Sequence, residues 1–532
     1  MIIALAWQDH LVIALYLAAV IGIGWYSARR QKSGDEFFLA SRSLPWWAVG
    51  ISIMATLMSS LTYLSEPGEV WKSGVTNLLG KLLAIALELY LVLYLLIPFL
   101  MRFRFTSAYE YLEYRFNLIA RRLGAALFCI LMITWLGFVV LSVARSLTHA
   151  SGMPLYAVIA TVGVIGTVST AAGGLRAVIW TEVAQFSLML GGCVITIGYI
   201  VWATHSGLGD WVRASNDFLA NSGQASVRWA NIDPFARTSV LTVAISMFVW
   251  NLVTHIGNQM MVQRYFSLSD ARAARRSFLL AQVFHVLIAV LLTITGLAIV
   301  YYYSAGPGRL SLNPLTEADL VFPHFMVEVL PPGLTGAVLA AVLAAAMSMM
   351  DSGINALATV ISVERRSWNR GDSLQQKQAS RGTEVSFARV ITISAGTLIT
   401  LAAFVLEPIT RDGNILELLP RTFNLFVVPM GGLFLLGIFV PCCNGRAAVV
   451  AAFAGLAASF NIAYAHLLYD VPKVSFTWVL PCTLGVMLIV ALLMSLLGRP
   501  EERRLRGLTW SRRHQRPEID ESLIAPGVTK NA

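Results

Sequence analysis

The stretch AAAMSMMDSG, residues 344–353, places a carboxylate and two hydroxyls in the middle of a long apolar run. The run extends from Gly333 to Val363, which is long enough for one helix to cross a bilayer. An ionisable side chain inside a span is costly, so it usually faces the interior of a helix bundle and serves a function. Ser348, Asp351 and Ser352 therefore mark a candidate functional site.

Apolar runs of this kind recur along the whole chain. Of its 532 residues, 57% are hydrophobic and 13% are charged, whereas an ordinary soluble domain is about 25% charged. The sequence predicts an all-α polytopic membrane protein with about 13 transmembrane helices. They are expected near residues 9–28, 44–66, 76–100, 120–147, 154–172, 177–203, 238–263, 277–303, 333–363, 387–406, 417–440, 446–469 and 475–498. Residues 1–498 form the transmembrane domain, and the first run lacks the basic start and cleavage site of a signal peptide.

The net charge of +10 follows from topology. Lys and Arg gather in alternate loops, which the positive-inside rule places in the cytoplasm. The rich loops follow the first, third, seventh and ninth spans, and the 365–389 loop is one of them. We therefore expect an N-terminus outside and a C-terminus in the cytoplasm, with no nucleic-acid partner. Residues 499–532 are predicted to be a basic cytoplasmic tail, either flexible or lying on the membrane surface.

The five cysteines lie in or beside spans, and no C-x-x-C spacing occurs. This pattern predicts neither a disulfide framework nor a transition-metal site.

Helical spacing gathers the polar residues of the opening stretch. Ala345, Ser348, Met349 and Ser352 are spaced i, i+3, i+4 and i+7, which places them on one helix face, and Asp351 lies at its edge. Hard oxygen ligands in a dry place suit a small hard cation. The alternative is that the serines bond their own helix or pack between helices.

Two other spans contain polar interruptions. They are ISIMATLMSSLTYLSEPGEVW, residues 51–71, and SMFVWNLVTHIGNQMMVQRY, residues 246–265. Paired broken helices in corresponding positions are typical of a transporter site between two repeats. Two merely polar interior helices would give the same pattern.

Five segments resemble the sodium:solute symporter family. FFLASRSLPWWAVGISIMATLMSS (37–60), GGLRAVIWTEVAQFSLMLGG (173–192), WNLVTHIGNQMMVQRYFS (250–267), VLAAAMSMMDSGINALATV (342–360) and LFLLGIF (433–439) occur in the family's order. MSSLTYLSEPGEVW (58–71) looks most similar to its iodide, monocarboxylate and multivitamin branch. The resemblance implies a LeuT-type core of inverted five-helix repeats, here about 44–203 and 238–440. It also implies sodium-driven symport of a small organic or inorganic solute by alternating access, in the plasma (inner) membrane. No enzyme activity, no cofactor and no obligate protein partner are expected; sodium is the only metal, and the lipid bilayer surrounds the chain.

The resemblance also implies sodium ligands. The principal ion would be held by the carbonyls of Ala55, Met58 and Ala345 and by the Ser348 hydroxyl. Met349 stands where the family has a second hydroxyl, and Asp351 could compensate by shifting the ion. Glu182 replaces the family's Asp, which serves a second sodium site or the sodium exit path in some members, with Asp351 and Ser352 as its partners.

The substrate pocket would lie between the two breaks. The resemblance assigns contacts to Ser60, Leu61, Thr62, Leu82, Ile85, Trp135 and Asn251, and an inner gate to Thr254. Leu61, Leu82 and Ile85 stand where sugar carriers have polar side chains, so a sugar is not expected. Lys81 borders this pocket and Arg421 would cap it, and two cations would suit a small anion.

Three alternatives remain open at this point. Proton coupling through Asp351 or Glu182 keeps the same fold, because a desolvated carboxylate can titrate near neutral pH. A membrane sensor would need a signalling module, and none follows residue 498. A membrane enzyme would need a nucleophile or metal cluster, which the sequence does not show.

Overall fold

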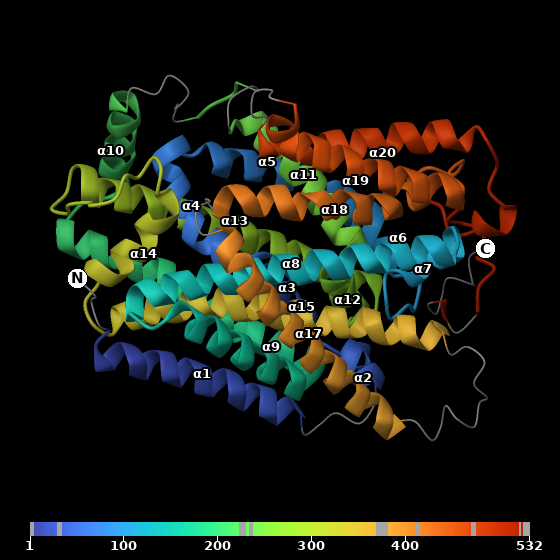
Figure 1. The fold of residues 1–532 in the computed structure, drawn as a ribbon, viewed down its shortest axis with the longest axis horizontal. Helices are drawn as coiled ribbons and strands as arrows, with labels where there is room; N and C mark the ends of the chain where they lie inside the picture. Colours follow the sequence, from blue (N-terminus) through green and yellow to red (C-terminus); the bar gives the residue numbers. More distant parts are fainter. Residues whose placement is uncertain are drawn as a thin grey trace.

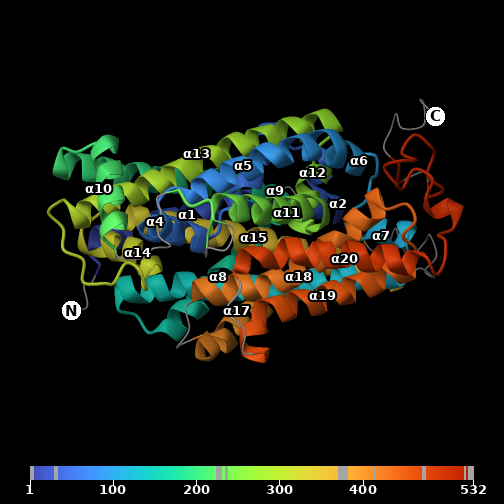
Figure 2. The same cartoon turned by 90° about the horizontal axis from the view of Figure 1, so that it is seen from above.

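The computed structural model describes residues 5–28, 34–222, 230–233, 238–368, 381–410, 415–469, 475–520, 523 and 524. Long helices lie lengthwise beside one another in this part of the chain (Figures 1 and 2). The N-terminal helix begins at one end of the bundle and the C-terminal segment lies at the other (Figure 1).

Eleven described helices are long and apolar enough to cross a membrane, and a bent pair makes a twelfth. The long helices are α1 (Trp7–Ala28), α5 with η2 and α6 (Thr76–Leu91, Val92–Leu96, Ile97–Leu100), α8 (Leu118–Ser151), α9 (Leu155–Thr204), α11 (Val240–Gly257), α13 (Ala271–Ser304), α15 (Leu334–Trp368), α17 (Arg381–Thr410), α18 (Ile415–Phe439), α19 (Gly445–Leu468) and α20 (Val479–Ser495). The bent pair is α3 (Trp46–Leu57) and α4 (Ser60–Ser73). All 13 predicted spans coincide with these helices. The bent pair matches one span, and α9 contains two.

The two parts of α9 meet at Gly174. Its φ of 52° lies in the left-handed region, which a residue without a Cβ adopts most easily. The apolar helix Leu155–Ala171 ends before this point, and the span Gly173–Thr204 continues beyond it. The glycine pair of GGLRAVIW is thus the break between two neighbouring spans.

Shorter helices connect or cover the spans. They are α2 (Gly34–Leu39), η1 (Ala40–Arg42), α7 (Glu110–Arg115), α10 (Leu208–Asn221), α12 (Gln259–Phe266), α14 (Ala318–Glu328), η3 (Phe476–Trp478) and η4 (Glu502–Arg504). α14 packs on α4, where a Cβ at Gly68 would lie 1.9 Å from the Ala318 carbonyl oxygen. The glycine therefore permits a backbone contact that holds α4 at its angle.

α15 is the most deeply buried of the candidate spans. It packs against α9, α17, α1, α8, α4 and α3, which explains why its sequence is apolar on nearly every side. Its start is held by Asp9 of α1, whose carboxylate accepts hydrogen bonds of 2.7 Å from the amides of Gly333 and Gly336. A carboxylate at a helix N-terminus is favoured by the helix dipole.

The C-terminal segment, residues 499–520, is folded against the bundle. Tyr111 of α7 donates a hydrogen bond of 2.8 Å to the Leu508 carbonyl, and the Trp510 amide donates one of 2.8 Å to the Ile438 carbonyl of α18. Leu508 is 1% exposed. The prediction of a flexible tail is therefore wrong for this segment, because its apolar and aromatic residues pack between α7 and α18; its position at the membrane surface stays a prediction.

Candidate functional site

The first break lies at Met58 and Ser59. α3 ends at Leu57, and Met58 has extended backbone angles (φ −89°, ψ 96°). The Ser59 hydroxyl then caps α4 by accepting a hydrogen bond of 3.1 Å from the Thr62 amide. The two helices are bent by 64°, so carbonyls in the last turn of α3 have no following helical amides to accept from.

The second break lies at Asn258. α11 ends at Gly257 and α12 begins at Gln259, with Asn258 extended between them (φ −83°, ψ 118°). The Asn258 side chain caps α12 by accepting from the Met260 amide at 2.9 Å. Both interruptions predicted from the sequence are therefore real breaks in the helices.

α15 presents a hydroxyl to the first break. The Ser348 Oγ lies 3.1 Å from the carbonyl oxygens of both Ala55 and Ala345. The Ser348 hydroxyl thus contacts two of the three carbonyls predicted to hold the principal sodium ion, and Met58, the third, follows α3 at the break. Met349 is fully buried next to Ser348 and brings no oxygen donor.

The side chain of Glu182 lies in a second buried cluster. It accepts hydrogen bonds from Ser52 and Thr56 of α3 and from Ser352 of α15, with 2.9 Å to Thr56. Arg264 of α12 donates to both of its oxygens, at 2.7 and 2.8 Å. The counter-charge of Glu182 in this structure is therefore an arginine, which the sequence pattern assigned to a basic loop.

Asp351 faces a different neighbour. One of its oxygens accepts hydrogen bonds from Ser169 at 2.8 Å and Thr170 at 2.6 Å, both in α9. Its side chain is 2% exposed. Among the described residues, no salt bridge to Asp351 is found, so its hydroxyl partners stabilise the carboxylate without neutralising it.

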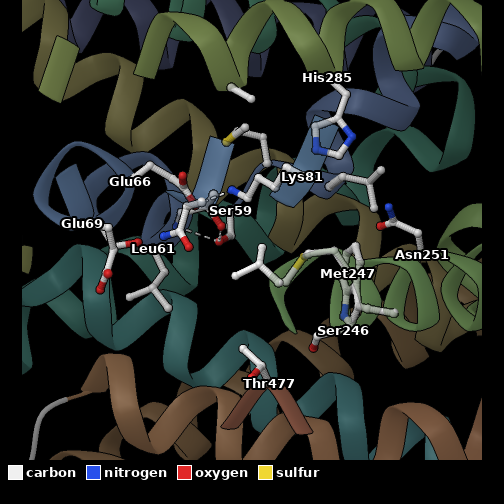
Figure 3. Close-up of a pocket in the computed structure, with 18 of the residues that line it drawn as sticks. Ser59, Leu61, Glu66, Glu69, Lys81, Ser246, Met247, Asn251, His285 and Thr477 are labelled. Atoms are coloured by element: carbon white, nitrogen blue, oxygen red, sulfur yellow. Dashed lines mark hydrogen bonds and ion pairs between the residues drawn. The ribbon is translucent and has the colours of Figure 1, made fainter. Parts of the chain in front are cut away.

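A cavity of about 260 Å³ adjoins the first break (Figure 3). It lies between α4, α5, α8, α11 and α13, beside η3. Five of the predicted substrate residues line it: Leu61, Thr62, Lys81, Trp135 and Asn251. Four do not: Ser60, Leu82, Ile85 and Thr254. Burial alone does not separate the two groups, because Asn251 of the lining group is 3% exposed, as Thr254 is.

The charge of this cavity differs from the expectation. Lys81 forms an ion pair with Glu66 of α4, and Figure 3 shows it extending from α5 toward that carboxylate. The inference that two cations would suit an anion is therefore wrong for Lys81, whose charge is already offset. The side chain of Arg421 lies outside the described residues.

Glu66, His285 and Asn424 are among the polar lining residues that sequence reasoning missed. Glu66 follows the first break by less than two turns, so its place near the site could have been found from the helix period. His285 is contributed by α13, and no pattern in that apolar run singles it out. Behind the cavity, Gln282 donates a hydrogen bond of 2.8 Å to the buried Glu88 carboxylate.

Comparison with known proteins gives a consistent result. The model of the sodium:solute symporter family matches residues 37–455. The sodium/sialic acid symporter SiaT of Proteus mirabilis is 29% identical over 83% of this chain and 86% of its own. The human sodium/iodide cotransporter is 30% identical over 87% of this chain and 70% of its own.

Solved structures agree in fold. A Na⁺-coupled sialic acid symporter in a substrate-bound outward-open state has a TM-score of 0.79 at 27% identity, covering 93% of this chain and 98% of its own. A nucleobase-cation-symport-1 family transporter has a TM-score of 0.53 at 14% identity, over 87% and 96% of the two chains, and so shows the fold alone. The expected LeuT-type architecture is confirmed.

Proposed function

Because the chain belongs to the sodium:solute symporter family, we propose that it imports a small solute by alternating access. The chain is a multi-pass membrane transporter, not an enzyme, and sodium is its coupling ion. The observation that carries the proposal is the meeting of Ser348 with Ala55 beside a central cavity. Ion and solute sites that share one broken helix can be coupled through it.

In this proposal the principal sodium is held by the carbonyls of Ala55, Met58 and Ala345 and by the Ser348 hydroxyl. Oxygen ligands suit a hard cation, and a site with few charges releases its ion readily. Glu182, Asp351 and Ser352 are proposed for a second ion. Glu182 already has Arg264 as a partner, so an ion there has to compete with a guanidinium.

The solute is proposed to occupy the cavity lined by Leu61, Thr62, Lys81, Trp135 and Asn251. Ser60, Leu82, Ile85 and Thr254 stay as predicted contacts for another stage of the cycle. We also propose the orientation predicted from the loop charges, with the C-terminal segment in the cytoplasm of a cell-membrane protein.

Uptake into proteoliposomes tests the proposal. Purified protein is reconstituted, and labelled small solutes are offered with an inward sodium gradient, with potassium in its place, or with a pH gradient alone. We expect accumulation only with the sodium gradient, and loss of it when an ionophore dissipates the gradient. Accumulation driven by the pH gradient without sodium would establish the proton-coupled alternative.

A further inference from the structure

The ion pair in the cavity indicates the kind of charge that a solute carries. Lys81 and Glu66 are each 14% exposed, and both line the cavity. They come from two consecutive helices, α4 and α5, so a solute that enters the cavity between these helices meets both charges. Figure 3 shows the pair beside Ser59, at the break itself.

Desolvation makes the pair selective. Charges interact strongly when water is scarce, and a buried charge that loses its partner is costly. A solute carboxylate that binds Lys81 displaces Glu66 and leaves it without a cation. A solute amine that binds Glu66 likewise leaves Lys81 without an anion. A solute that carries both charges gives each of the two side chains a new partner of opposite charge.

The rest of the cavity fits the same kind of solute. Glu69 also lines it, one turn along α4 from Glu66. Aromatic rings also line the cavity, where Trp135 and Phe423 have ring centroids 4.8 Å apart. An apolar body between the two charges of a solute would contact these rings.

We propose that the solute is a zwitterion, with its carboxylate on Lys81 and its ammonium group on Glu66. This inference rests on the proposed function, because it takes the cavity to be the one that the transported solute enters. It replaces the small anion expected from the sequence with a solute of no net charge and two opposite ends.

Binding is measured by thermal stabilisation of the purified protein in sodium, without any need for transport. The probes are zwitterions of graded size (glycine, proline, phenylalanine), a carboxylate (propionate), an amine (propylamine) and a neutral polyol (inositol). We expect zwitterions alone to stabilise the wild type. Glu66→Gln should weaken zwitterion binding about tenfold or more and make the carboxylate the better probe, and Lys81→Met should favour the amine.

Lys72→Met is the matched control, since Lys72 lies on α4 and does not line the cavity. A gain of carboxylate binding in Glu66→Gln cannot come from misfolding. The inference is overturned if the carboxylate, amine or polyol stabilises the wild type better, if no zwitterion stabilises it, or if Glu66→Gln leaves the preference unchanged. The proposed function fails separately, if a probe that binds is not accumulated under a sodium gradient.

Discussion

Arg264 binds both oxygens of the Glu182 carboxylate, with its Nη2 at 2.7 and 2.8 Å from them. Arg264 is 1% exposed and Glu182 fully buried. The pair joins α12, next to the second break, to α9, and Ser52 and Ser352 bond to it from α3 and α15. The two broken helices are therefore tied together through one desolvated charge pair.

Breaking this pair should destabilise the protein. Glu182→Gln or Arg264→Met alone leaves a buried charge and should cost about 3–5 kcal/mol of unfolding free energy. The double variant removes both charges, and we expect it to unfold at a higher temperature than either single variant. Thermal unfolding in detergent measures this, with Arg503→Gln as the control in an exposed ion pair. A double variant whose destabilisation equals the sum of the two single ones would show that the charges act independently.

Ser348→Ala should weaken sodium affinity more than the maximal rate of uptake. Loss of a buried hydroxyl ligand costs about 1–3 kcal/mol, which corresponds to about five- to hundredfold in affinity. The sodium dependence of initial uptake measures it. Ser187→Ala is the control, because Ser187 is exposed on α9 and bonds only its own helix. An unchanged sodium dependence would place the ion elsewhere.

Asp351→Asn should abolish sodium-driven uptake and leave folding intact. Asparagine keeps an acceptor for Ser169 and Thr170, but it removes the charge that has no salt-bridge partner in the described part of the chain. Met349→Ser in the same variant should restore part of the sodium affinity by supplying the missing hydroxyl. Normal uptake with normal sodium dependence in Asp351→Asn would make the carboxylate structural.

Leu508→Asp should release the C-terminal segment. Burying an apolar side chain of this size contributes about 1.5–3 kcal/mol, and a charge in its place adds a desolvation cost. We expect faster tryptic cleavage after the arginines of residues 503–516. Glu518→Gln is the control, since its ion pair with Arg506 is exposed. Equal cleavage rates in both variants would contradict the docking described here.

Labelling with an impermeant thiol reagent tests the orientation. A cysteine-free background is required because Cys442 and Cys482 are exposed. Ser311→Cys, in an exposed loop after α13, should react from outside intact cells, and Ser373→Cys, in the 365–389 loop, should not. The reverse pattern would invert the topology.

The features that depend on local sequence patterns could be predicted from the sequence. Apolar runs predicted the spans, and polar interruptions predicted the breaks at Met58 and Asn258. Pairing between distant helices was not predictable, because the helix period shows that a residue is buried and not what lies opposite it. Arg264 therefore read as a loop charge, and Lys81 as a free cation. Nothing in the sequence around Tyr111 or Leu508 indicates that these two residues are in contact.

The folded C-terminal segment has a mechanical consequence. Tyr111 belongs to the predicted first repeat, and Ile438 to the end of the second, so residues 508 and 510 strap the two halves together at one end of the bundle. If each transport cycle opens this end of the bundle, either the Tyr111–Leu508 or the Trp510–Ile438 hydrogen bond has to break in every cycle. We expect that fusing a rigid domain to this segment would change the speed of the cycle.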